Sequence, residues 1–246
     1  FCTPGFVMSM FAHHKSHAKP EREAIIESLG GNLCRCTGYR PILDAAVQMY
    51  TPAKEDQFDR SEQQTSSELA AIRAAGESGS LSGAGRTYMA PRSVQALSQC
   101  LIEHPNARLV AGATDLSLEI TQALVEVPLL VYTGAVAEMT RCEEQAETIE
   151  IGGAATYSDC KALLTQFWPH LGELIERLGS LQVRNQGTIG GNVGNASPIG
   201  DMPPVLIVLN AQLLLRRGDQ QRTLPIEDFF KGYRKTDLQA GEFINQ

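Results

Sequence analysis

The sequence of 246 residues lacks the features that define several common classes of protein. No apolar run reaches the roughly 18 residues that a membrane-spanning helix needs, so no transmembrane segment is expected. Positive charge is in deficit, because 21 Lys and Arg stand against 28 Asp and Glu, giving a formal net charge of −7. The basic residues do not cluster, and since binding to nucleic-acid phosphates requires clustered positive charge, nucleic acid is not an expected partner.

Cysteines are few and unevenly placed. Three of the six lie near the N-terminus and three are scattered, which is unlike the dense framework of a small secreted disulfide protein and favours a reducing, cytoplasmic compartment. The chain also has no initiator Met and no signal-peptide pattern, so we expect it to begin within a longer protein. The cysteines are Cys2, Cys34, Cys36, Cys100, Cys142 and Cys160.

The length and composition favour two domains joined by a linker. The chain exceeds the roughly 100–150 residues of a typical domain, and its hydrophobic content of 43% is ordinary for a globular protein. Residues 51–85 are rich in Glu, Asp, Gln, Ser and Gly, which predicts a flexible linker with one short helix near residues 67–75. The two domains are therefore expected at residues 1–50 and 86–246, and a single large domain is the alternative.

The two predicted domains differ in structural class. Residues 1–50 show apolar residues at helical spacing after Thr3, after Pro20 and after Pro41, with Thr3 as a candidate cap, which predicts a small all-α domain. Short apolar runs then alternate with helical patterns, which predicts an α+β domain that is truncated as it approaches a further strand. The predicted strands are 108–111, 129–132, 148–152 and 212–216, and the predicted helices are 93–103, 158–166 and 169–178.

Three cysteines form the first candidate site. Cys34 and Cys36 are two residues apart in a loop, so both side chains can face one metal centre, and Cys2 directly precedes a predicted helix. Exposed N–H groups at a helix start favour an anionic cluster whose sulfurs accept hydrogen bonds. The same ligands suit a structural zinc site, and ordinary buried cysteines are a third interpretation.

The other histidines and cysteines are expected to be structural. His13, His14 and His17 lie close together on one predicted helix, but such histidines are more often solvent-exposed than metal-binding, and exposure is expected here. The three scattered cysteines have no partner at ligand spacing, so they are expected to be small buried apolar residues.

Two glycine-rich segments form the second candidate site. Val110-Ala-Gly-Ala-Thr-Asp-Leu116 follows a predicted strand, and its small residues let backbone N–H groups approach a pyrophosphate. It does not match the dinucleotide fingerprint in which glycines open a helix, and a plain turn is the alternative. Residues 184–201 contain five glycines among Asn, Thr and Ser, and an irregular stretch of this length is typical of a binding loop. A helix is expected from Asp201 to Leu209.

The sequence around the first three cysteines is specific. It reads Cys2-Thr-Pro-Gly-Phe and, later, Asn32-Leu-Cys-Arg-Cys-Thr-Gly-Tyr-Arg-Pro-Ile-Leu-Asp44. Together these segments resemble the α-helical [2Fe–2S] domain of the molybdenum hydroxylases, the family of xanthine dehydrogenase and aldehyde oxidase. In that family the first segment reads Cys-Gly-x-Cys-Thr-Pro-Gly, so the first cysteine of the pair would precede residue 1. The resemblance implies that three of four cluster ligands are Cys2, Cys34 and Cys36.

The two glycine-rich segments closely resemble the FAD-binding module, of PCMH type, of the same family. There the first loop wraps the FAD diphosphate, and the second continues along the cofactor to a Ser-Pro-x-x-Asp segment. The run Asp228-Phe-Phe-x-Gly-Tyr-Arg-Lys-Thr236 resembles the family's segment at the nicotinamide-nucleotide entrance, and the rest of the module is absent. The resemblance implies that the FAD-binding residues are Leu109, Val110, Ala111, Gly112, Ala113, Thr114, Asp115, Leu116, Leu178, Gly179, Thr188, Ile189, Gly190, Gly191, Asn192, Ser197, Asp201, Tyr233, Arg234 and Ile244.

The resemblance also implies an electron-transfer function. In the family, a molybdenum cofactor on another domain or chain hydroxylates a purine or aldehyde, and electrons run through two [2Fe–2S] clusters to FAD and then to NAD. Fusion of both modules resembles the small subunit of bacterial xanthine dehydrogenase, which implies a molybdopterin-binding partner chain, a hetero-oligomer and a role in purine catabolism. No His or carboxylate suggests itself as a catalytic acid or base. The alternatives are a molybdenum hydroxylase for aldehydes or other N-heterocycles, a flavin oxidase that uses oxygen, and a zinc-stabilised interaction module.

Overall fold

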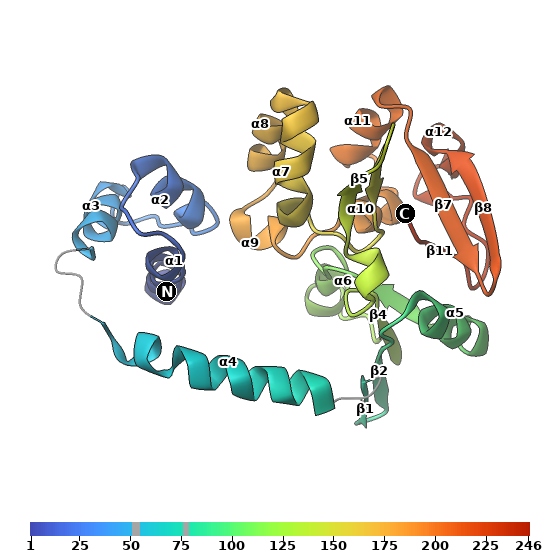
Figure 1. The fold of residues 1–246 in the computed structure, drawn as a ribbon, viewed down its shortest axis with the longest axis horizontal. Coiled ribbons are helices and arrows are strands. Elements are labelled where there is room, and N and C mark those ends of the chain that lie inside the picture. The colour runs from blue at the N-terminus through green and yellow to red at the C-terminus, as the bar shows by residue number, and fades with distance from the viewer. Residues whose placement is uncertain (51–54, 76–78) are drawn as a thin grey trace. The chain divides into compact units, whose positions relative to one another are not determined.

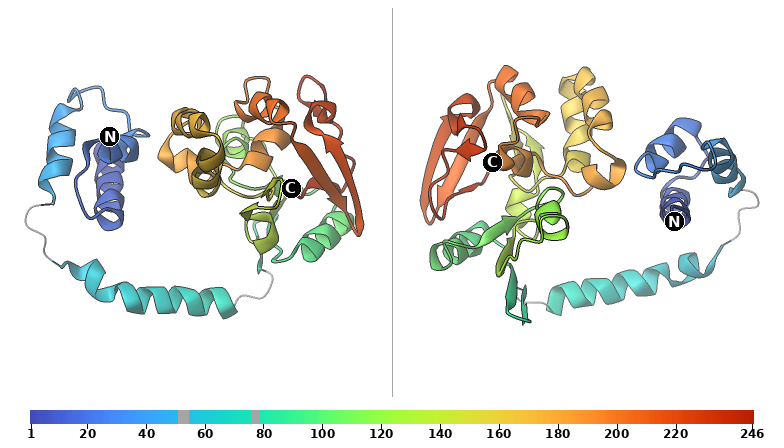
Figure 2. Two further views of the ribbon diagram at one scale, coloured as in Figure 1. Left: turned by 45° about the horizontal axis from the view of Figure 1, so that its top comes forward. Right: turned by 180° about the vertical axis from the view of Figure 1, so that it is seen from behind.

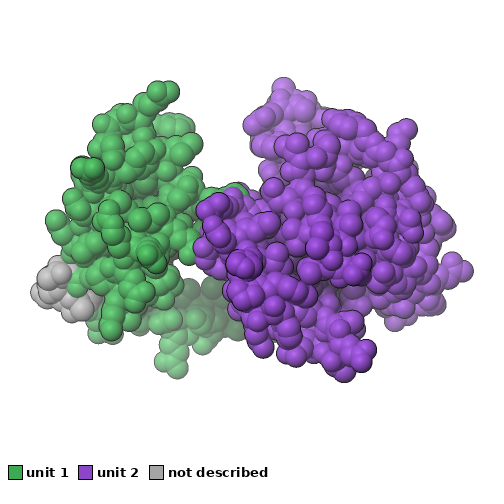
Figure 3. Space-filling view, turned by 90° about the horizontal axis from the view of Figure 1, so that it is seen from above, with its two compact units in different colours: residues 1–77, 179–182 green, residues 78–178, 183–246 purple. Residues whose placement is uncertain are grey.

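The computed structural model describes residues 1–50, 55–75 and 79–246. The chain divides into two compact units, one of residues 1–77 and 179–182 and the other of residues 78–178 and 183–246 (Figure 3). Each unit has its own hydrophobic core. Within these described ranges, no helix is both long and apolar enough to cross a membrane.

The described part of the first unit is helical, which confirms the predicted all-α N-terminal domain (Figure 1). Apolar residues of its first three helices meet in one core that contains Phe6, Ile25, Leu29 and Ala46. Thr3 lies in the first turn of its helix rather than capping it, and Cys2 occupies the N-cap position. The helices are α1 (Thr3–Ser16), α2 (Arg22–Leu29), α3 (Arg40–Gln48) and α4 (Gln57–Ala75).

The segment predicted as a linker contains more regular structure than expected. Helix α4 is much longer than the helix predicted at 67–75, because this stretch is rich in good helix formers and in pairs one turn apart, such as Gln64 and Glu68, whose side chains hydrogen-bond at 2.8 Å. Residues 79–83 form a strand. Residues 51–54 and 76–78 lie outside the described residues, and the domain limits at 50 and 85 stay a prediction.

His13 is buried in the first unit, contrary to the expected exposure. Its side chain is 3% exposed, and its Nδ1 lies 2.9 Å from Oγ of Ser28 on α2. Its ring stacks on that of His17, with the ring centroids 4.1 Å apart. Burial, followed by the proximity of His17 and His14, lowers the pKa of His13 below its ordinary value.

We expect the first unit to lose stability as the pH falls below about 6.5, the ordinary pKa of histidine. Because the pKa of His13 is lowered on folding, the unfolded state takes up the proton first, so the stabilising contribution is complete above that pH and decreases below it. Thermal unfolding of the whole chain across this range measures the effect. His13→Asn should remove most of the dependence, whereas His170→Asn, at an exposed position, should retain it. An unchanged pH profile in His13→Asn would contradict this account.

The second unit contains the remaining elements, and the pattern of mixed helices and strands confirms the predicted α+β class. In chain order they are β1 (Gly79–Gly83), β2 (Arg86–Ala90), α5 (Val94–Glu103), β3 (Arg108–Val110), α6 (Leu116–Thr121), β4 (Leu129–Tyr132), the 3₁₀ turn η1 (Ala137–Met139), β5 (Cys142–Glu144), β6 (Ile149–Ile151), α7 (Tyr157–Phe167), α8 (Pro169–Arg177), α9 (Leu181–Arg184, partly assigned to the first unit), α10 (Ile189–Asn195), α11 (Met202–Val208), β7 (Gln212–Arg217), β8 (Gln220–Pro225), α12 (Ile226–Phe229), β9 (Phe230–Gly232), β10 (Lys235–Thr236) and β11 (Phe243–Ile244).

A four-stranded sheet opens the second unit, with strand order β1-β2-β4-β3. Strands β1 and β2 form an antiparallel hairpin, whereas β2 and β3 both pair in parallel with β4. Parallel neighbours need a crossover, and α5 and α6 follow β2 and β3 accordingly. Leu97 and Leu101 of α5 join Val131 of β4 in the buried core, so the sheet holds the end of β3 in a fixed position.

The other elements of this unit form two further cores. Helices α7 and α8 lie side by side (Figures 1 and 2), and α7 packs with the β5–β6 hairpin around Cys160, Leu164 and Ile175. A second sheet is antiparallel, in the order β11-β7-β8, and its core includes Leu215 and Phe229. The predicted strands correspond to β3, β4, β6 and β7, and the predicted helices to α5, α7, α8 and α11.

Two predictions for the glycine-rich and terminal segments are wrong. Residues 184–201, expected to be an irregular loop, contain helix α10, because Thr188 caps its first turn. The last residues, expected to approach a strand, already form one, since β11 pairs with β7. Predicted FAD-binding residues therefore lie within regular structure, since Asn192 belongs to α10 and Ile244 to β11.

Candidate functional site

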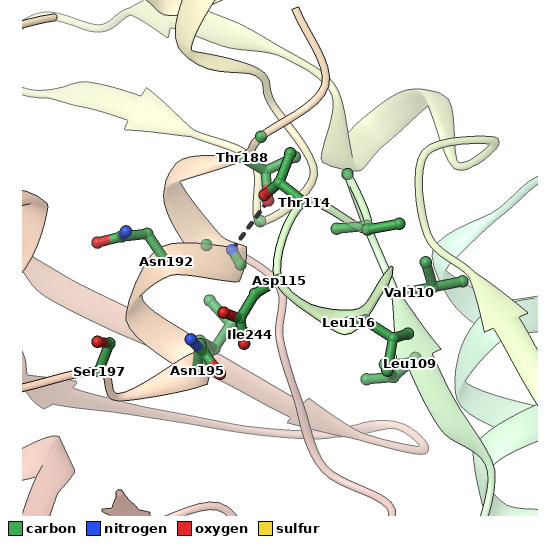
Figure 4. A pocket seen from close by; sticks show the side chains of 18 of the residues that line it. Leu109, Val110, Thr114, Asp115, Leu116, Thr188, Asn192, Asn195, Ser197 and Ile244 are labelled. Atoms are coloured by element: carbon green, nitrogen blue, oxygen red, sulfur yellow. Dashed lines mark hydrogen bonds between the residues drawn. The ribbon is translucent and has the colours of Figure 1, made fainter. Parts of the chain in front are cut away.

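A cavity of about 720 Å³ lies in the second unit, lined by both glycine-rich segments. This volume falls within the roughly 300–1,000 Å³ of typical cofactor and small-molecule pockets. In Figure 4, side chains of β3 and α6 lie on one side, and side chains of α10 and the following loop lie on the other. The labelled side chains on these two sides are Leu109, Val110, Leu116, Asn192, Asn195 and Ser197.

The first glycine-rich segment makes a tight turn at the end of β3. A Cβ atom on Gly112 would lie 1.8 Å from the carbonyl oxygen of Gln186, so the two segments touch backbone to backbone. Ala113 has a φ of 58°, in the left-handed region that residues with a side chain rarely adopt. Such strained backbone is found preferentially at ligand sites, where surrounding packing maintains it.

The second glycine-rich segment is organised by Thr188 at the start of α10. Its Oγ1 accepts a hydrogen bond from the N–H of Gly191 at 2.9 Å, shown as the dashed line in Figure 4. A Cβ atom on Gly190 would lie 2.3 Å from the carbonyl oxygen of Gly153. The glycines therefore allow close backbone packing at the edge of the cavity.

Two buried polar atoms from the cavity lining fit a bound ligand. Oδ1 of Asn192 and the hydroxyl of Tyr157 have no hydrogen-bond partner within the described residues. Burial, followed by the proximity of Asp201, raises the pKa of Tyr157. Since buried polar groups are nearly always paired, the small-residue lining and these atoms together suit a polar cofactor such as FAD.

Most residues predicted to contact FAD line this cavity, and three do not. Ile189 is 4% exposed and belongs to the core beneath α10, Tyr233 is 76% exposed, and Gly179 is outside the lining. Contact with FAD itself stays a prediction. The predicted residues in the lining are Leu109, Val110, Ala111, Gly112, Ala113, Thr114, Asp115, Leu116, Leu178, Thr188, Gly190, Gly191, Asn192, Ser197, Asp201, Arg234 and Ile244.

The sequence prediction missed several lining residues. Asn195 lies inside the glycine-rich run, so its position alone could have suggested it. Gly153, Tyr157, Leu238 and Phe243 reach the cavity from distant parts of the chain, and no local motif marks them.

Arg222 holds the segment that leads to β11 at the cavity. Its Nε and Nη2 each donate to the carboxylate of Glu242 at 2.7 Å, and its Nη1 donates to Asp237 at 2.5 Å. The guanidinium lowers the pKa of Asp237. Burial of Glu242 opposes its ionisation, but the bonds from Arg222 and from the N–H of Gln239 outweigh burial and leave its pKa below the usual value.

Cys2 and Cys34 lie together beside the core of the first unit. The sulfur of Cys34 accepts hydrogen bonds from the hydroxyl of Thr37 and from the N–H of Cys36, both at 3.4 Å. These bonds, with that from Thr37 first, lower the pKa of Cys34 to about 6. The thiolate, which is the metal-binding form, is therefore favoured at neutral pH.

The three cysteines predicted as cluster ligands are near one another but do not form a closed metal site. Within the described part of the chain, no group of three or more His, Cys, Asp or Glu side chains could hold a metal ion. Cys36 is exposed and contacts Cys34 through its backbone N–H. Thiols with N–H and O–H donors directed at sulfur nevertheless suit an iron–sulfur cluster, and their role as ligands stays a prediction.

We expect Cys34→Ser to lower iron uptake at least ~10-fold, because loss of a single supporting partner at a metal site already has an effect of this order. The measurement is the iron and sulfide content of the whole chain after anaerobic reconstitution. Cys100→Ser is the matched control, because Cys100 lies in the second unit beside Met89. Equal iron content in the parental and Cys34→Ser chains would contradict the assignment.

Two family models match the chain. Residues 81–246 match the FAD binding domain in molybdopterin dehydrogenase, and residues 1–47 match the [2Fe-2S] binding domain. Both candidate sites thus fall within matched regions.

Known proteins with similar sequences or structures include three oxidoreductases. Xanthine dehydrogenase of Emericella nidulans is 28% identical, with an alignment covering 100% of this chain and 22% of that protein. The chain therefore spans about a fifth of that relative's length. Quinoline 2-oxidoreductase of Pseudomonas putida 86 has a TM-score of 0.61 and 30% identity, covering 64% of this chain and 56% of that one. Carbon monoxide dehydrogenase of Hydrogenophaga pseudoflava has a TM-score of 0.60 and 28% identity, with the same coverage.

Proposed function

Since the match to the FAD-binding domain covers more than half of the chain, the chain belongs to the molybdopterin dehydrogenase family, and we propose that it is the electron-transfer part of a xanthine dehydrogenase-like molybdenum hydroxylase. The chain carries the family's [2Fe–2S]-binding and FAD-binding domains. The proposal concerns how these domains work together and with which partners.

One observation supports the proposal above all others, namely that both glycine-rich segments line a single cavity. An iron–sulfur cluster exchanges single electrons and a flavin exchanges one or two, so the two groups connect one-electron to two-electron chemistry. The backbone around Gly112 and Gly191 gives a polar cofactor close access, while Thr188 caps the first turn of α10, which contains Gly191. These residues bind and orient a cofactor, and rigid positioning of this kind accounts for much of the effect of a protein on redox chemistry.

The proposed electron donor is a molybdenum centre on a molybdopterin-binding partner chain, and the proposed acceptor is NAD. Similarity to xanthine dehydrogenase supports a purine as the substrate of the complete enzyme. Similarity to quinoline 2-oxidoreductase supports another N-heterocycle as the alternative substrate class. The proposed neighbours of the nicotinamide nucleotide are Arg234 and Tyr233. Arg234 lines the cavity and has a φ of 51°, and Tyr233 is exposed.

Anaerobic mixing of NADH with the whole chain, reconstituted with FAD, iron and sulfide, tests the proposed acceptor. The proposal predicts bleaching of the flavin band first and of the broader iron–sulfur absorption afterwards. If dithionite bleaches both bands and NADH bleaches neither, NAD is not the acceptor, whereas the relay between the two groups remains supported. Rapid air reoxidation of the reduced protein without NAD would instead favour a flavin oxidase.

A further inference from the structure

Two cysteines of the second unit belong to neither candidate site and share one hydrophobic cluster in the fold. Cys142 is the first residue of β5, and Cys160 lies in the first turns of α7, a helix that contacts β5. Both elements are labelled in Figure 1. The side chain of Cys142 packs against the buried cluster that contains Cys160. Their sequence separation gave no indication of this pairing, because it depends on how a strand packs on a helix.

The surroundings of the pair are apolar. Cys160 has no exposed surface and belongs to the core with Leu164 and Ile175, whereas Cys142 is half-buried at the edge of that core. Neither cysteine lines the cavity. Small oxidants can therefore reach Cys142 from solvent, whereas the core shields Cys160 from solvent.

We propose that Cys142 and Cys160 form a disulfide bond when the protein meets hydrogen peroxide. The thiolate of Cys142 attacks one peroxide oxygen, the O–O bond breaks, and the released hydroxide takes up a proton to leave as water. The sulfur of Cys160 then attacks the resulting sulfenic acid, its proton joins the departing hydroxyl, and a second water leaves. Overall, two thiols and one hydrogen peroxide give one disulfide and two waters.

The different surroundings of the two thiols set the order of these steps. The nearby side chain of Cys160 lowers the pKa of Cys142, while Cys142 and burial raise the pKa of Cys160. Since the thiolate is the nucleophile, Cys142 reacts with peroxide first and Cys160 resolves the sulfenic acid. The two sulfurs must then approach to the roughly 2 Å of a disulfide bond.

Peptide mass spectrometry of the whole chain tests the proposal directly. Trypsin releases Cys142 and Cys160 on one peptide, Cys142–Lys161, because no Lys or Arg lies between Arg141 and Lys161. After mild treatment with hydrogen peroxide, alkylation with iodoacetamide in denaturant should leave this peptide unmodified and lighter by two hydrogen atoms than the reduced peptide. Dithiothreitol before alkylation should restore both hydrogens and add two carbamidomethyl groups.

The chain supplies its own controls. Peptide 93–108 contains Cys100 alone and should remain alkylated after the same treatment. In Cys142→Ser, the thiol of Cys160 should also be alkylated in denaturant after peroxide. A peptide Cys142–Lys161 that carries two carbamidomethyl groups after peroxide, or one that carries only higher oxides of sulfur, would overturn the proposal. The test needs neither FAD nor iron, so its result is independent of the proposed function.

The disulfide should also stabilise the second unit. It would tie β5 to α7, the helix that supplies Tyr157 to the cavity lining, across a loop of moderate length. A cross-link over such a loop predicts that peroxide raises Tm by roughly 5–10 °C in a chain of this size. The increase should disappear in Cys142→Ser and on reduction.

Discussion

Gly112→Ala should weaken FAD binding by about 100-fold or more, because displacing a binding group by about 1 Å has consequences of this order. The added Cβ would lie 1.8 Å from the carbonyl oxygen and 2.4 Å from the carbonyl carbon of Gln186. Both atoms belong to backbone, so neither can rotate away as the end of a side chain would. The two glycine-rich segments must separate, and the cavity between them changes shape. Titration of the apoprotein with FAD, followed by quenching of flavin fluorescence, gives the affinity.

The matched control for this change is Gly83→Ala. Gly83 lies in the β1–β2 hairpin, and a Cβ there would meet no atom within 4 Å. This variant should bind FAD like the parental chain. Circular dichroism of Gly112→Ala separates lost binding from lost folding. A folded Gly112→Ala chain with parental FAD affinity would show that the cavity is not the FAD site.

Arg222→Met should lower the free energy of unfolding of the second unit by about 2–3 kcal/mol, somewhat below the cost of breaking a fully buried ion pair. The side chain of Glu242 is 6% exposed, so loss of Arg222 leaves a nearly buried carboxylate without its cation. Asp237 loses a partner at 2.5 Å in the same change. Urea denaturation at neutral pH measures the difference between parental and variant chains.

The pH dependence of this difference gives an independent check. Folding lowers the pKa of both Asp237 and Glu242, so their contribution is present above the ordinary carboxylate pKa, about 4, and is lost as the pH falls below it. The stability difference between the parental chain and Arg222→Met should therefore shrink in acid. Arg86→Met is the control, because the exposed pair of Arg86 and Glu126, 3.8 Å apart, should contribute less than about 1 kcal/mol. An Arg222→Met chain as stable as Arg86→Met would contradict the role assigned to Arg222.

Sequence patterns correctly predicted those helices and strands whose formation depends mainly on neighbouring residues. The apolar run at residues 129–132 coincides with β4, and the helix expected at 93–103 is α5, capped by the side chain of Ser93. Helix α10 escaped prediction because three glycines in seven residues have a low intrinsic helix propensity. The helix forms because Thr188 caps it and Gly190 packs against Gly153, which is a tertiary effect.

Sequence patterns also identified only part of the candidate site. Residues in the two glycine-rich segments were found through motifs, whereas Tyr157 and Phe243 reach the cavity from separate elements and carry no motif. His13 was misjudged because its burial depends on α2, which places Ser28 against it. The sequence also did not indicate that Cys142 and Cys160 share one cluster, since a strand and a helix bring them there.

The visible absorption spectrum of the whole chain, reconstituted anaerobically with FAD, iron and sulfide and then reduced with dithionite, tests the central claim most directly. The account predicts flavin bands together with broader iron–sulfur absorption, and both should bleach on reduction. A protein that remains colourless after reconstitution and retains neither FAD nor iron would contradict the electron-transfer function.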